Sequence, residues 1–171
     1  MDFFNEYIVK KQNTAADFAK IAGIILGGLV LIFILMLFMR FVGSLFLLLA
    51  AAVIYGMYYF ISSQSIEFEY IVTNGELDID KIIARRRRKR LVSVDSKDFE
   101  YFAPYSEKYS REYSAQDINK KINAAGTLNA ENVFFAVYHK NNEKICLIFQ
   151  PTEKMVKEFS LRMPRSVFFT E

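Results

Sequence analysis

One continuous apolar stretch, Ile21 to Ile61, constrains the fold of this chain more than any other feature, and only Arg40 and the nearby Gly43-Ser44 pair interrupt it. The segments on either side of Arg40, residues 21–39 and 41–61, contain no charged residue. As helices, each is about 30 Å long, which is the thickness of a bilayer core. Each predicted helix is apolar on all of its faces, so neither has a polar face that could contact water. The stretch therefore predicts two transmembrane helices joined by a short turn, and disfavours a helical hairpin inside a soluble core.

Basic residues flank these two segments unevenly. Lys10, Lys11 and Lys20 precede the first segment and a run of basic residues follows the second, whereas Arg40 is the one basic residue at the turn. Because basic flanks stay on the cytoplasmic side, we expect both termini in the cytoplasm. A signal peptide does not fit, since the first apolar run is too long and a second follows without a cleavage region.

Residues 1–20 form a distinct N-terminal segment. Phe3, Phe4, Tyr7 and Ile8 follow helical spacing within residues 1–12. This spacing predicts a short amphipathic helix, and two placements stay open for it. The helix lies in the interface of the inner leaflet, or it packs on the soluble part of the protein.

Small residues recur along both predicted spans: Gly23, Gly27, Gly28, Gly43, Ala50, Ala51 and Gly56. Small side chains let two helix backbones approach closely in lipid. Packing between the two helices of one hairpin is the favoured interpretation, and a homo-oligomer formed through the same residues stays open.

After Ser65 the apolar period changes from helical to two. Apolar residues alternate with polar ones from Ile66 to Val72, and Asn74-Gly75 follows directly. Asn-Gly between alternating runs is the strongest short signal for a two-residue β-hairpin. The predicted cross-strand pairs are Val72 with Leu77, Tyr70 with Ile79, and Ile66 with Ile83.

The remainder of the chain predicts further strands and one helix. The strands fall at residues 91–94, 99–105, 118–124, 133–139 and 145–149, with residues 106–132 otherwise weakly patterned. Thr152 is the expected N-cap of a terminal helix that Pro164 ends. We therefore expect a soluble α+β domain over residues 66–163, with at most seven strands and one helix, followed by a tail at residues 164–171.

This arrangement resembles the pleckstrin-homology-like fold, an antiparallel β-barrel closed by a C-terminal helix. Residues 69–77 and 90–94 look like the opening of the bacterial modules of this fold. Over nearly its full length the chain is similar to an uncharacterised family of small bacterial proteins with two transmembrane helices, through TNGELDIDKI, the basic tract after it and LIFQPTEKM. The resemblance implies the bacterial cytoplasmic (inner) membrane as location and implies no activity. Eukaryotic members bind phosphoinositides through basic loops, and that site does not transfer to the positions of this chain.

A run of six basic residues is the candidate lipid-contact site: Arg85, Arg86, Arg87, Arg88, Lys89 and Arg90. Six neighbouring cations cannot all be buried, so we expect them at an exposed hairpin tip, in contact with anionic lipid headgroups. The alternative is a run that sets membrane topology and is otherwise solvated. Nucleic-acid binding is disfavoured, because no aromatic platform or helix-turn-helix pattern accompanies the run.

Acidic residues gather on the first predicted hairpin: Glu67, Glu69, Glu76, Asp78 and Asp80. A divalent-cation site is one interpretation, although strands spread carboxylates too widely for a compact oxygen cage. Pairing with Lys81, Lys89 or neighbouring basic residues is favoured.

Catalytic chemistry has little support in the sequence. Cys146 lies inside an apolar strand, and His139, the single histidine, cannot form a metal cluster. We expect no catalytic residue, cofactor or metal. The expected function is a non-enzymatic, membrane-anchored interaction or regulatory module with a protein partner. The alternative is a small accessory subunit of a membrane transporter or enzyme complex that acts through its helical hairpin.

Overall fold

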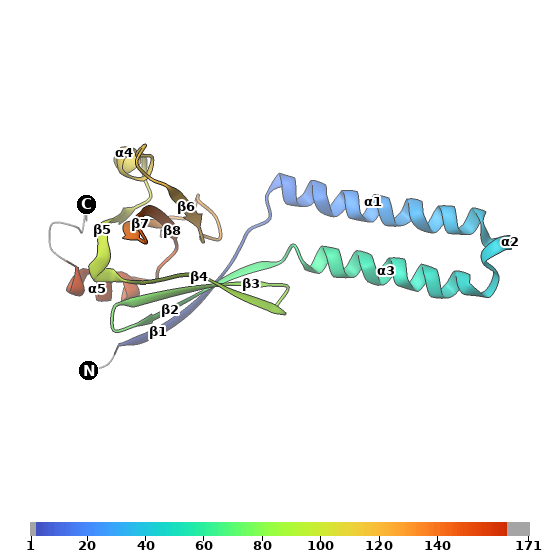
Figure 1. Ribbon diagram of the computed structural model, residues 1–171, viewed down its shortest axis with the longest axis horizontal. Helices are drawn as coiled ribbons and strands as arrows, with labels where there is room; N and C mark the ends of the chain where they lie inside the picture. The colour runs from blue at the N-terminus through green and yellow to red at the C-terminus, as the bar shows by residue number, and fades with distance from the viewer. Residues whose placement is uncertain (1–2, 164–171) are drawn as a thin grey trace. The chain divides into compact units, whose positions relative to one another are not determined.

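A computed structural model describes residues 3–163 of the chain (Figure 1). The chain divides into two compact units. One unit is Gln12–Ile66, and the other combines Met1–Lys11 with Glu67–Glu171.

The unit Gln12–Ile66 is a helical hairpin. Helix α1 (Ala15–Leu37) is followed by α2 (Met39–Val42), the 3-10 turn η1 (Gly43–Leu45) and α3 (Phe46–Ser62). Thr14 caps α1 in a capping box, in which its side chain accepts from the Asp17 amide and the Asp17 carboxylate accepts from Thr14. Residues 15–37 and 39–62 are each long and apolar enough to cross a membrane.

Among the glycines of this hairpin, Gly28 alone lies close against the other helix. A Cβ atom added there would lie 2.1 Å from the sulfur of Met57 on α3, so a larger residue cannot be accommodated without a shift. The predicted packing of small residues between the two helices is thus confirmed at Gly28. Gly23, Gly27 and Gly56 have no atom within 4 Å of such a position, and they line an open apolar groove of about 320 Å³.

The first sheet has the strand order β1-β2-β3-β4. Its strands are β1 (Phe4–Lys10), β2 (Ile66–Thr73), β3 (Glu76–Ile83) and β4 (Arg87–Asp95). The predicted N-terminal helix is wrong, because residues 4–10 form β1 and pair antiparallel with β2 from Phe4↔Thr73 to Lys10↔Glu67. Strand pairing satisfies the backbone groups of this segment with a partner that lies beyond both helices in the sequence.

The predicted hairpin at Asn74-Gly75 is confirmed. The two residues between β2 and β3 have φ angles of 51° and 89°, the left-handed region that a tight hairpin turn requires. Apolar residues of both strands are fully buried as the predicted face requires: Tyr70, Val72, Leu77 and Ile79.

The second sheet has the order β5-β7-β8-β6. Its strands are β5 (Phe99–Pro104), β6 (Lys120–Asn123), β7 (Phe134–Lys140) and β8 (Glu143–Phe149), and β6 runs parallel to β8. Short helical turns lie between strands: η2 (Ser96–Asp98), η3 (Glu107–Tyr109) and α4 (Ser110–Tyr113). Residues 66–163 hold seven strands, β2 to β8, which agrees with the predicted limit, and β1 adds an eighth from the N-terminal segment. The eight strands of the described residues form two separate sheets, so the predicted closed barrel is wrong.

Helix α5 (Glu153–Arg162) begins as predicted, because the side chain of Thr152 accepts from the Met155 amide at 3.4 Å. Its Phe159 ring meets Phe102 of β5 and Phe149 of β8 at centroid distances of 5.6 and 6.3 Å. Tyr70 of β2 meets Phe149 at 6.0 Å and donates a 2.7 Å hydrogen bond to the Ala124 carbonyl. Aromatic packing and this buried hydroxyl therefore hold the two sheets and α5 around one core.

Candidate functional site

The basic run lies on the β3–β4 hairpin. Ala84, Arg85 and Arg86 form the turn, and Arg87 to Arg90 are the first residues of β4. Ala84 and Arg85 have positive φ angles of 53° and 55°, and the Arg86 amide closes the turn by donating to the Ile83 carbonyl at 3.0 Å. All six basic residues are exposed, so the predicted hairpin with arginines at its tip is confirmed as a structure.

This turn lies at the end of the first sheet where β1 ends and β2 begins. Lys10 and Glu67 are register partners at this end. The guanidinium Nε of Arg85 lies 3.3 Å from Oε1 of Glu67, which places the turn beside the start of β2. The chain therefore leaves for α1 and returns from α3 at the end of the sheet that carries the arginine turn.

Strand alternation separates the basic residues of β4 onto two faces. Arg88 and Arg90 lie on the face of the carboxylates. Nη1 of Arg88 is 2.8 Å from Oε2 of Glu69, and Nη1 of Arg90 is 2.6 Å from Oδ2 of Asp78. Arg90 also pairs through Nε with Asp80, and this hydrogen bond raises the pKa of its guanidinium.

Two of these carboxylates are nearly excluded from solvent. Glu69 is 3% exposed and Asp80 is 4% exposed. Arg88 reaches both of them, with Nη1 at 2.8 Å from Glu69 and 3.8 Å from Asp80. Arg88, together with Arg90 on Asp80, thus offsets the repulsion between two buried carboxylates, which would otherwise be costly.

Four of the five acidic residues of the hairpin therefore pair with neighbouring basic residues, as favoured from the sequence, while Glu76 accepts from the Ser93 hydroxyl at 3.5 Å. The partners are Arg85, Arg88 and Arg90, and not Lys81 or Lys89. No group of three or more histidine, cysteine, aspartate or glutamate side chains within residues 3–163 could hold a metal ion.

Lys81, Arg87 and Lys89 lie on the other face of the hairpin. The register pairs Lys81 with Lys89 and Ile83 with Arg87. Among the described residues, none of these three side chains makes a hydrogen bond or ion pair. The division of the basic run between two faces was not predicted from the sequence. The period-two alternation of β4 indicates such a division, but the irregularity between Ile79 and Asp80 shifts the register, so the sequence alone does not show which residues share a face.

A groove of about 360 Å³ runs along the carboxylate face. Ile8 of β1 and Ile82 of β3 form its apolar lining, and the charged lining consists of Glu67, Glu69, Arg85, Arg86 and Arg88. Arg87, which the register places on the other face, also borders the groove. The contribution of Ile8 was not predicted, because it depends on β1 being a strand.

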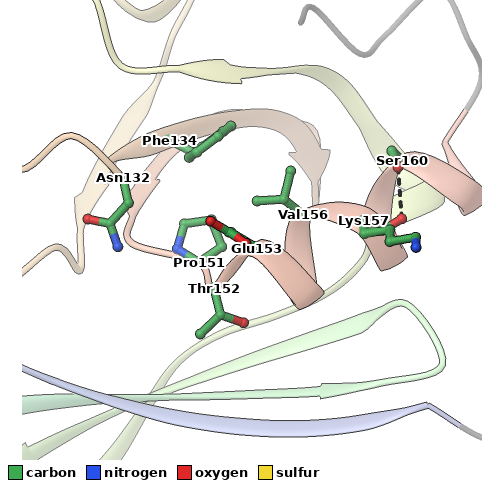
Figure 2. A pocket seen from close by; sticks show the side chains of 8 residues that line it. All are labelled: Asn132, Phe134, Pro151, Thr152, Glu153, Val156, Lys157 and Ser160. Carbon is green, nitrogen blue, oxygen red and sulfur yellow. Dashed lines mark hydrogen bonds between the residues drawn. The ribbon is translucent and has the colours of Figure 1, made fainter.

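A second groove, of about 440 Å³, lies at the start of α5 (Figure 2). Figure 2 shows Phe134, Pro151 and Val156 around it, with Asn132 and Lys157 at opposite sides. The Lys157 carbonyl accepts a 2.8 Å hydrogen bond from the Ser160 hydroxyl. The lining also includes Glu153 and Lys157, and both residues are exposed.

The sequence candidates for nucleophilic chemistry lie apart. Cys146 is fully buried in β8, and burial raises the pKa of its thiol to about 11. His139 ends β7 and pairs with Glu100, with Nδ1 at 2.8 Å from Oε1. The register of β7 and β8 places Cys146 opposite Val137 and His139 opposite Lys144, so the thiol and the imidazole are not register partners.

Comparison with known proteins gives one family. The model of the family described as bacterial PH-like domain (DUF6106) matches residues 1–169. No curated protein and no solved structure matches the chain.

Proposed function

Because the chain belongs to the family of bacterial PH-like domain proteins, we propose that it is a non-enzymatic interaction module anchored in the bacterial inner membrane by two helices. PH-like domains often bind lipids or proteins. In this proposal the basic turn contacts anionic lipid of the inner leaflet, and the domain recruits or regulates a protein partner from there. The observation that carries the proposal is the position of the turn, at the end of the sheet from which the chain leads to both helices.

The short segments between the sheet and the two helices support contact between this end of the sheet and a bilayer. Residues 11–14 connect β1 to α1, and residues 63–65 connect α3 to β2. Connections of three or four residues span at most about 15 Å. Two such connections hold the arginine turn close to the bilayer once the helices are inserted.

Charge sets the strength of the contact. Six positive charges in the run face four paired carboxylates, those of Glu67, Glu69, Asp78 and Asp80, which leaves two. Each net basic charge near an anionic surface contributes about 1 kcal/mol, so the run contributes about 2 kcal/mol in place of about 6. That energy is too small to hold a soluble protein at a membrane, and sufficient to orient a domain that is already anchored.

A single tryptophan tests the proposed contact, because the chain contains none. Ile83→Trp places the probe beside the turn, and Thr73→Trp places a matched probe at the opposite end of the hairpin β2–β3. The full chain is reconstituted in vesicles that contain brominated lipid, which quenches nearby tryptophan. We expect quenching of Ile83→Trp in anionic vesicles and little quenching of Thr73→Trp.

Salt serves as the control in the same experiment. The Debye length falls from about 30 Å at 0.01 M to about 8 Å at physiological ionic strength, so quenching of Ile83→Trp should decrease as salt rises. Equal quenching in anionic and neutral vesicles at all salt concentrations would overturn the lipid contact.

The second candidate function is an accessory subunit that acts through the helical hairpin. The open groove at Gly23, Gly27 and Gly56 favours it, because small residues without a neighbour admit another helix. Purification in mild detergent separates the two functions. A fixed stoichiometric membrane partner that Gly23→Leu removes would support the subunit.

A further inference from the structure

We infer that Lys81 and Lys89, with Arg87 beside them, bind the phosphate group of an anionic lipid. The inference rests on the proposed function and assigns the contact to one face of the β3–β4 hairpin. The other face is the carboxylate face, on which Arg85, Arg88 and Arg90 are paired.

The register places the three cations on the face that forms the core further along the strands. Ile79 pairs with Val92, and both are buried. Lys81 pairs with Lys89 next along that face. Exposure increases in this direction, because Lys81 is half-buried while Lys89 and Arg87 are exposed near the turn. The cations therefore extend the core face toward the end of the sheet that leads to the helices.

Lys81 and Lys89 oppose one another directly across the strands, an arrangement that is unfavourable for like charges. Among the described residues neither has a carboxylate partner, since the acidic side chains of this hairpin point to the opposite face. Directly opposed residues have Cβ atoms about 5 Å apart, so both ammonium groups can reach one anion. An anion shared between them replaces the repulsion with two charge-assisted hydrogen bonds.

Phosphate fits this arrangement better than a single carboxylate does. Its several oxygens accept from two ammonium groups at once and leave another for Arg87, which is two residues from Lys89 on the same face. The position of the turn favours a lipid as the source, because the site lies at the end of the sheet that the two short connections tie to the helices.

Lysine acetylation of the unmodified full chain in nanodiscs tests the site. The rate at each lysine is read by mass spectrometry in nanodiscs of neutral lipid, in nanodiscs with anionic phospholipid, and in neutral nanodiscs with added inorganic phosphate. We expect Lys81 and Lys89 to react at least about fivefold more slowly with anionic phospholipid alone. Lys97 in η2, whose side chain is 62% exposed, is the internal control and should react equally in all three.

The three arms separate the outcomes. Equal protection by inorganic phosphate would identify a small phosphate compound and overturn the lipid as ligand. No protection in any arm would overturn the site, and the proposed function survives that result if Ile83→Trp is still quenched in anionic vesicles. Loss of both signals would overturn the two together.

A charge-matched pair of variants distinguishes a site from general attraction. Lys81→Gln/Lys89→Gln and Lys120→Gln/Lys121→Gln remove the same charge, the first pair from the proposed site and the second from exposed positions of β6 in the other sheet. With Ile83→Trp as the reporter, the first pair should raise the anionic fraction needed for half-maximal quenching at least threefold, and the second less than 1.5-fold. Equal shifts would show that net charge alone acts and would overturn the site.

Discussion

Arg87 and Arg88 are adjacent in the sequence and have different physical roles in the structure. The Arg88 side chain lies against two buried carboxylates, whereas the Arg87 side chain makes no hydrogen bond or ion pair within residues 3–163. A run of chemically similar residues therefore contains one group that stabilises the hairpin and another that is available to a ligand. The sequence predicts the exposure of the run, because charge density alone requires it. It does not predict the division, which depends on the register across β3 and β4.

Arg88→Gln should lower the free energy of unfolding by about 1–2 kcal/mol, because it leaves the carboxylate of Glu69 buried without its main partner. The expected value is at the lower end for a buried pair, since the Arg88 side chain is itself 57% exposed. Arg87→Gln is the matched control and should change the stability by less than about 0.5 kcal/mol.

Urea unfolding of the full chain in detergent measures this difference, with alkylation of Cys146 as the readout. Cys146 is the single cysteine, fully buried, and its raised pKa of about 11 keeps it protonated, so it reacts once the domain opens. Adding Glu69→Gln to Arg88→Gln should recover part of the loss. Equal stabilities for Arg87→Gln and Arg88→Gln would contradict the assignment.

At the scale of elements, the structures that depend on local sequence patterns were predicted correctly, whereas the pairing of distant strands was not. Asn74-Gly75 is a local signal, because two residues alone set the turn, and Thr152 likewise caps its own helix. β1 was missed because its partner β2 follows both helices in the sequence, and seven residues with aromatic groups fit a helical face as well as a strand. Two open sheets in place of a closed barrel reflect pairing between distant strands, which no local pattern specifies.

Gly126→Ala tests how β1 docks. The added Cβ would lie 2.6 Å from the backbone oxygen of Lys10 and 2.7 Å from Cγ1 of Val9, and a backbone atom cannot move away cheaply. We expect a loss of about 1–3 kcal/mol in stability and faster hydrogen exchange at the amides of β1. Gly23→Ala is the control, because its Cβ would have no neighbour within 4 Å, and it should leave β1 unchanged. Unchanged exchange in β1 of Gly126→Ala would contradict the docking of this strand.

At the scale of the whole molecule, the domain is built from both ends of the chain. β1 precedes the helical hairpin and β2 follows it, so the first sheet is complete only when both flanks of the hairpin lie on the same side of a membrane. This requirement agrees with the basic residues that flank the hairpin and with Arg40 as the one basic residue at its turn. It also means that a fragment beginning at Ser65 lacks a strand of the sheet that carries the arginine turn.

The most direct test of the account is the accessibility of two introduced cysteines in bacterial spheroplasts. Ser44→Cys lies in the exposed turn between the helices, and Lys97→Cys lies on the surface of the domain, while native Cys146 is buried. We expect a membrane-impermeant maleimide to label Ser44→Cys in intact spheroplasts and to label Lys97→Cys only after permeabilisation. Labelling of Lys97→Cys in intact spheroplasts, or protection of both positions, would contradict a domain anchored at the cytoplasmic face by two membrane-spanning helices.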